Sequence, residues 1–164
     1  MSIYGDWKIH LVDTGLNTQT GGRIAKLKDW VGDDTFMLTY GDGVADVDLR
    51  ELVGFNRENK KIATVTAVRP PARFGSLHFE GSAVTHFNEK PESGEGWING
   101  GFFVFQKKVF DYLNSNDDCD FEVGPLEQLT QDGQLMVYHH KGDWACMDTY
   151  RDSVFLNNLW EKGH

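Results

Sequence analysis

The 164-residue sequence has only four prolines and two cysteines, and it has no long hydrophobic run. No segment is low in complexity or repeated and no linker divides the chain, so we expect a single, partial domain over residues 1–164. Cys119 and Cys146 fit no metal-ligand spacing and are too few for a disulfide framework, which indicates ordinary thiols. No apolar run approaches the roughly 20 residues that span a bilayer, and no signal peptide pattern opens the chain. We therefore expect a soluble, cytoplasmic protein that does not enter a membrane.

Basic residues are also scarce. Sixteen Lys and Arg against 25 Asp and Glu give a net charge of −9, which argues against nonspecific nucleic-acid binding. One anionic ligand is still compatible with this charge, because a local Lys or a divalent metal reverses the potential at a single site. The six histidines show no metal-ligand pattern, and G-x-S-x-G, P-loop and G-x-G-x-x-G motifs are missing. Hydrolase and dehydrogenase functions are therefore disfavoured.

The hydrophobic fraction of 40% and the aromatic fraction of 13% are enough to build a core. The first half of the chain alternates expected strands (7–12, 36–40 and 62–68) with expected helices (24–31 and one that Asp48 caps). The nearly continuous apolar run 36–40 predicts a strand buried on both faces. This alternation is typical of an α/β sheet with parallel strands.

The second half adds an antiparallel part. Residues 76–79 and 83–87 predict two short strands around a turn at 80–82. Further strands are expected at 102–105 and 135–138, and helices around Val109–Leu113, Leu126–Leu129 and Val154–Trp160.

Two acidic residues are candidate metal ligands. Asp42 follows the 36–40 strand between two glycines, where its carboxylate could face a divalent metal while the backbone leaves room for a phosphate. The alternative is an ordinary Gly-rich turn. Asp148 precedes the last helix, and from position alone N-capping of that helix is the better interpretation. Because Mg²⁺ between phosphates is held by one or two carboxylates, the metal hypothesis requires the two residues to be close.

Further candidates lie in short polar segments. In Glu89-Lys90-Pro91 the proline extends the chain at Lys90, which could act as a point charge on a phosphate; a solvated charged pair is the alternative. In Asn99-Gly100-Gly101 the glycines allow close backbone approach and Asn offers a donor and an acceptor; a hairpin or bulge is the alternative. Two more glycine corners, Arg73-Phe74-Gly75 and Thr20-Gly21-Gly22-Arg23, indicate little individually.

Taken in order, these segments resemble the sugar-1-phosphate nucleotidyltransferases, and among them the enzymes that transfer a cytidylyl group to glucose 1-phosphate. The resemblance rests on seven segments, spread from about Trp7 to the last helix: 12–15, 20–23, 40–46, 73–75, 89–91, 99–103 and 147–149. It implies a Rossmann-like nucleotidyltransferase fold, a mixed and mostly parallel sheet flanked by helices. It also implies conversion of CTP and glucose 1-phosphate to CDP-glucose and pyrophosphate, within O-antigen or other surface-polysaccharide biosynthesis.

The resemblance also implies roles for particular residues. Asp42 and Asp148 would hold the catalytic Mg²⁺, and Lys90 would contact the sugar phosphate. Glu89, Asn99, Gly100 and Gly75 would form the sugar site. The nucleotide pocket would include Thr20, Gly21, Gly22, Arg23, Tyr40 and Gly41. Such a site suits phosphoryl transfer, which depends on positioning and charge neutralisation rather than on a protein nucleophile.

One family feature has no match. The resemblance implies a Gly-rich G-G-x-G-T-R loop near the start, and residues 1–6 do not contain it. We therefore expect the family's N-terminal strands to be missing, with an exposed sheet edge that could pair with another chain. Three interpretations stay open: an impaired truncated product, one half of a split enzyme completed by a separate N-terminal chain, and a noncatalytic sugar-phosphate-binding module. The partner at the exposed edge could be this complementing N-terminal chain or a second copy in a homo-oligomer.

Overall fold

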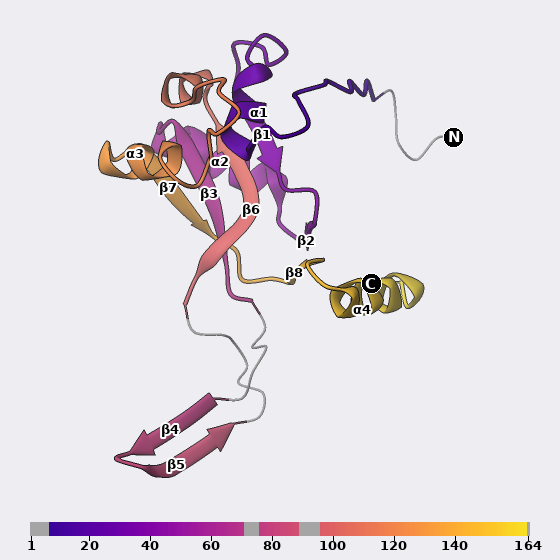
Figure 1. Ribbon diagram of the computed structural model, residues 1–164, viewed down its shortest axis with the longest axis vertical. Coiled ribbons are helices and arrows are strands. Elements are labelled where there is room, and N and C mark those ends of the chain that lie inside the picture. The colour runs from indigo at the N-terminus through magenta and orange to yellow at the C-terminus, as the bar shows by residue number, and fades with distance from the viewer. Residues whose placement is uncertain (1–6, 71–75, 89–95, 164) are drawn as a thin grey trace.

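A computed structural model describes residues 7–70, 76–88 and 96–163 of the chain. At its centre is a mixed four-stranded sheet in the order β1-β6-β3-β7, made of β1 (Phe36–Thr39), β6 (Ile98–Phe105), β3 (Ala63–Val68) and β7 (Leu135–His139). β6 runs antiparallel to both of its neighbours, whereas β3 and β7 pair in parallel. β1, β3 and β7 therefore run in one direction and only β6 opposes them. The mixed sheet expected from the sequence is confirmed, with most of its strands parallel, although β3–β7 is the one parallel pairing in the described sheet (Figure 1).

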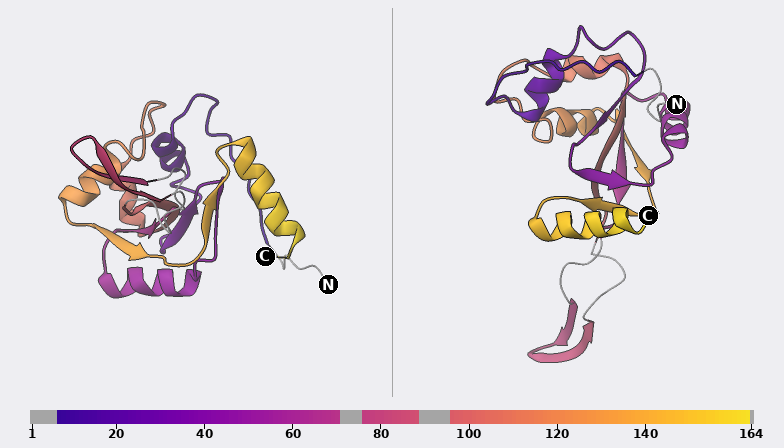
Figure 2. Two further views of the ribbon diagram at one scale, coloured as in Figure 1. Left: turned by 90° about the horizontal axis from the view of Figure 1, so that it is seen from below. Right: turned by 90° about the vertical axis from the view of Figure 1, so that its right-hand side faces the viewer.

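Helices cover both faces of this sheet (Figure 2). α2 (Leu49–Asn59) lies on one face, and α1 (Thr20–Lys26), the 3₁₀ helix η1 (Lys107–Tyr112) and α3 (Pro125–Gln131) lie on the other. Successive side chains of β6 point to opposite faces of the sheet. Phe103 and Phe105 enter the core cluster beneath η1 and α3, and Val104 is buried on the other face. The α/β class thus follows from a sheet whose central strands bury side chains on both sides.

Two smaller ribbons and a last helix extend from this body. β2 (Gly43–Ala45) pairs antiparallel with β8 (Trp144–Cys146), and β4 (Ser76–Glu80) pairs antiparallel with β5 (Ala83–Asn88). The expected hairpin around 80–82 is confirmed, and it lies apart from the main sheet (Figure 1). α4 (Tyr150–Glu161) follows β8 and has no buried residue. Among the described residues no helix is long and apolar enough to cross a membrane.

Helix caps explain where the helices begin. Asp48 caps α2 as predicted, since its carboxylate accepts hydrogen bonds from the amides of Arg50 and Glu51 at 2.8 and 3.1 Å. The prediction that Asp148 caps the last helix is wrong. Thr149 is the N-cap of α4 and forms a capping box with Asp152.

Three further expectations are corrected. Residues 7–12 form no strand: no described strand lies alongside to pair with them, and Leu11 is 95% exposed. The helix expected over 24–31 instead spans Thr20–Lys26 and ends in turns. Strand β1 is not buried on both faces, because it lies at the edge of the described sheet and Met37 is 41% exposed.

Candidate active site

Asp42 and Asp148 lie next to the same end of the β2–β8 ribbon. Asp42 directly precedes β2, and the register pairs Gly43 with Cys146. The ladder continues one step further, because the amide of Met147 donates to the Asp42 carbonyl oxygen at 2.9 Å. The backbones of Asp42 and Asp148, more than 100 residues apart in the sequence, are therefore brought to neighbouring strand ends, and both residues are exposed.

Carboxylate oxygens such as those of Asp42 and Asp148 are the ligands that a hard divalent cation prefers. Because Thr149 and Asp152 cap α4, Asp148 is not used as the helix cap; its Oδ2 lies 3.1 Å from Cys146 Sγ. Among the described residues no group of three or more His, Cys, Asp or Glu side chains could hold a metal ion. A cation at Asp42 and Asp148 would therefore complete its coordination with water and substrate phosphates, as Mg²⁺ commonly does.

The ribbon is fixed to the main sheet through Gly100. The indole N–H of Trp144 donates to the Gly100 carbonyl oxygen at 2.9 Å. A Cβ on Gly100 would lie 2.7 Å from Val68 Cγ1 and 3.1 Å from the Thr66 carbonyl oxygen, so only glycine fits between these strands. The Trp144 hydrogen bond thus links the predicted sugar-site position Gly100 to β8, the strand that pairs with β2.

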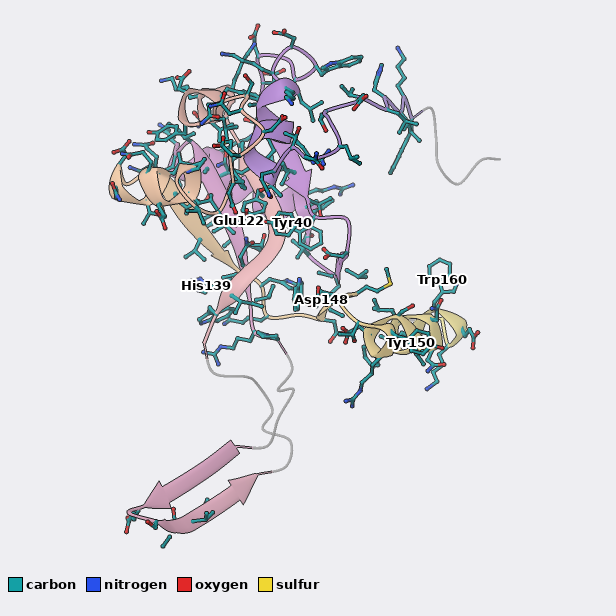
Figure 3. All side chains as sticks on the ribbon, viewed as in Figure 1. Tyr40, Glu122, His139, Asp148, Tyr150 and Trp160 are labelled. Carbon is teal, nitrogen blue, oxygen red and sulfur yellow. The ribbon has the colours of Figure 1, made fainter. Side chains whose placement is uncertain are left out.

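A hydrogen-bond network joins residues that the sequence predicts for the nucleotide pocket (Thr20 and Tyr40) to one predicted for the sugar site (Asn99). The Tyr40 phenol contacts Glu122 Oε1, and the Asn99 amide donates to the phenol oxygen at 3.1 Å. The Thr20 hydroxyl donates to Glu122 Oε2 at 3.0 Å. Figure 3 shows Tyr40 and Glu122 side by side, between β1 and the loop before α3. Burial, followed by the hydrogen bond to Glu122, raises the pKa of Tyr40 well above its usual value, so the phenol remains a neutral donor.

The Gly21-Gly22-Arg23 corner lies inside α1 rather than in a loop. A Cβ on Gly22 would lie 2.4 Å from the Asn116 carbonyl oxygen, and one on Gly21 would lie 2.7 Å from Cys119 Sγ. The two glycines therefore let α1 pack closely against the 116–121 segment. Arg23 turns back to hydrogen-bond the Thr14 hydroxyl at 2.8 Å, which secures the preceding loop.

A cleft with a volume of about 1460 Å³ opens between the β2–β8 ribbon, the 140–143 turn and α4. Gly41 and Asp42 line it, whereas Thr20, Tyr40, Asn99 and Asp148 lie outside its lining. The 140–143 turn is stabilised by His140, which is 8% exposed and whose Nε2 lies 2.9 Å from Asp46 Oδ1. Thus the predicted residues divide between the cleft wall, the Tyr40 network and the packed α1 corner.

Other predicted positions fall elsewhere. Gly75, Glu89 and Lys90 lie outside the described residues. Sequence analysis missed Glu122, which meets Tyr40 across 82 positions. No local motif marks it, because its significance depends on a contact between β1 and the loop before α3.

Together, the sheet covered by helices and the cleft that Asp42 lines beside a strand end define an α/β domain with a candidate ligand site. The family model described as "Nucleotidyl transferase" matches residues 8–159. The chain belongs to the nucleotidyl transferase family.

Curated relatives agree with this assignment. The chain is 47% identical over 158 residues to glucose-1-phosphate cytidylyltransferase of Salmonella typhi and 45% identical over 157 residues to a probable glucose-1-phosphate cytidylyltransferase of Bacillus subtilis. Both matches cover 96% of this chain, and the chain spans 61% of the length of each relative.

Solved structures share the fold. A UDP-glucose pyrophosphorylase complexed with UDP-glucose matches with a TM-score of 0.67 and 13% identity, over 93% of this chain and 66% of that one. HddC from Yersinia pseudotuberculosis matches with a TM-score of 0.64 and 21% identity, over 87% of this chain and 62% of that one.

Proposed function

We propose that this chain takes part in a sugar-1-phosphate nucleotidyltransferase reaction that joins CTP to glucose 1-phosphate and releases pyrophosphate. The observation that carries the proposal is the β2–β8 pairing, which places Asp42 and Asp148 at one ribbon end. The choice of CTP and glucose 1-phosphate is supported by the 45–47% identity to the two cytidylyltransferases.

In this reaction an oxygen of the sugar phosphate attacks the α-phosphorus of CTP, a new P–O bond forms, and the bond to the β-phosphate breaks. The bound Mg²⁺ would supply charge neutralisation on the phosphates. Asp42 and Asp148 would hold it, while Lys90 would neutralise the sugar phosphate and Glu89 would bind sugar hydroxyls. Asn99, Gly100 and Gly75 would complete the sugar site.

On the nucleotide side we propose Thr20, Gly21, Gly22, Arg23, Tyr40 and Gly41. The Tyr40–Glu122–Asn99 hydrogen bonds support a rigid link between this side and the sugar side. A link of this kind favours reaction because phosphoryl transfer depends on holding two substrates in line.

The test is pyrophosphate release by the purified chain with CTP, glucose 1-phosphate and Mg²⁺, repeated with Asp42→Asn and Asp148→Asn. We expect each substitution to lower kcat by at least about 100-fold, since each removes a carboxylate that neutralises phosphate charge through the metal. Asp118→Asn, at an exposed carboxylate away from the ribbon, is the matched control and should retain wild-type turnover.

Wild-type rates in both ribbon variants would contradict the metal-ligand assignment. Calorimetric titration separates the remaining interpretations. A chain that binds glucose 1-phosphate without turnover would be a noncatalytic sugar-phosphate-binding module or one half of a split enzyme.

A further inference from the structure

Arg69 and Trp97 form a stacked pair at the end of the main sheet. Arg69 directly follows β3 and Trp97 directly precedes β6, and the register pairs the adjacent Val68 with Ile98. The guanidinium carbon of Arg69 lies 4.7 Å from the centroid of the Trp97 ring. His139, at the end of β7, meets the same indole edge-on with ring centroids 4.7 Å apart. Three neighbouring strands thus fix the aromatic platform on which the guanidinium rests.

The Arg69 guanidinium is exposed and has no acidic partner among the residues that the structure describes. Two of the described cations do have such partners, Lys26 with Asp117 at 2.8 Å and Lys107 with Asp33. The chain has a net charge of −9, and yet none of the described carboxylates pairs with Arg69. Within the described part of the chain, the guanidinium is therefore held in place by stacking, and no carboxylate occupies its N–H groups.

The pair also lies near the candidate active site, because Arg69 and Trp97 line the same cleft as Gly41 and Asp42. The lining of this cleft also includes the carboxylates Asp42 and Asp46, which would repel an anion in the absence of a cation. Arg69 supplies positive charge on the wall where the main sheet ends.

Stacking covers one face of a guanidinium and leaves the N–H groups at its edge, which match two oxygens of a phosphate. We propose that Arg69, stacked on Trp97, contacts a phosphate group of a substrate in this cleft; the inference rests on the proposed function. The phosphate belongs either to the sugar 1-phosphate or to the nucleotide, and Trp97 is a positioning residue that fixes the guanidinium.

The experiment is calorimetric titration of the full chain with glucose 1-phosphate, with CTP plus Mg²⁺, and with inorganic pyrophosphate. Arg69→Gln should weaken binding of at least one of these compounds by about 10-fold or more, because it removes a charge-assisted hydrogen bond pair. Arg69→Lys should restore part of the loss, since a point charge remains without the planar fork. Arg57→Gln, at an exposed residue in the last turn of α2, is the matched control and should bind like the wild type.

The ligand that loses affinity identifies the source of the phosphate. A loss confined to glucose 1-phosphate indicates the sugar phosphate, and a loss for CTP and pyrophosphate indicates the nucleotide. Unchanged binding of every compound by Arg69→Gln would overturn the inference and leave the proposed function standing. A wild-type chain that binds pyrophosphate through Arg69 but neither substrate would uphold the phosphate contact and refute the proposed function. A wild-type chain that binds none of the three would overturn both.

Discussion

Tyr40 shows how one side chain can join two parts of a site. It directly follows strand β1, and its phenol is held between Glu122 and Asn99. The sequence made Tyr40 a candidate because it stands beside Gly41-Asp42, but it gave no sign of the partner, since Glu122 lies 82 positions further along. Contacts at such separations depend on the folded sheet rather than on a local pattern.

At the residue scale we predict that Tyr40 keeps its proton beyond the pH at which a free tyrosine ionises. Burial and then Glu122 raise its pKa, so the stability that this shift contributes is present below the usual tyrosine pKa and is lost as the pH rises toward the raised one. The measurement is ultraviolet absorbance of phenolate during a pH titration, with Tyr40→Phe subtracted from the wild type.

Glu122→Gln removes the negative charge beside the phenol and should move the Tyr40 midpoint down toward the usual value. A wild-type difference curve that already has the midpoint of a free tyrosine would show that the phenol is not held by Glu122.

At the scale of single elements, the glycines of α1 and α2 have opposite environments. Gly22 is buried, and an added Cβ would meet the Asn116 carbonyl oxygen at 2.4 Å, whereas nothing lies within 4 Å of one on Gly54 in α2. Helix propensity alone would make alanine stabilising at both positions by about 0.5–1 kcal/mol. At Gly22, the close packing of α1 makes the same substitution destabilising.

We therefore predict that Gly22→Ala destabilises the chain by about 1–3 kcal/mol through overpacking against backbone. Gly54→Ala, the matched control, should stabilise it by about 0.5–1 kcal/mol. Both are measured as the change in the free energy of unfolding in urea. Equal stabilisation by the two substitutions would contradict the close contact between α1 and the 116–121 segment.

Elements were predictable where a local signal sufficed. Asp48 followed by an apolar helical face gave α2, and the β-branched run of β3 gave a buried strand. Residues 7–12 have the same strand pattern but form none, because a strand also needs a neighbour to pair with. The cap of α4 was placed one residue early, since Asp148 and Thr149 are both good caps and only the capping box with Asp152 distinguishes them.

At the scale of the whole molecule, ligand binding should raise the stability of the fold. A ligand that binds only the native state adds about 2.7 kcal/mol at 100 times its Kd. We predict that glucose 1-phosphate, and CTP with Mg²⁺, each raise the melting temperature in a thermal-shift experiment, and that EDTA abolishes the CTP effect. Glucose without phosphate is the control and should leave the melting temperature unchanged; a melting temperature that neither substrate moves would contradict the proposed function.

The expectation of a partner also belongs to this scale and stays a prediction, as does the treatment of residues 1–164 as one domain. The chain spans 61% of the length of its two cytidylyltransferase relatives. The pyrophosphate-release assay tests whether the chain turns over by itself. Light scattering tests whether it forms a homo-oligomer, and a folded monomer without turnover would favour a complementing chain.

The sequence by itself determined the α/β class, the family and most strands and helices, because hydrophobic periodicity, capping residues and glycine-flanked motifs are local signals. It also singled out Asp42 and Asp148 as separate candidates. Only the tertiary structure decided that the short β2–β8 ladder brings their backbones to one ribbon end, and that Arg69 is held on Trp97 beside the cleft. Antiparallel pairing and aromatic stacking join residues far apart in the chain, and no spacing in the sequence encodes which distant partners will meet.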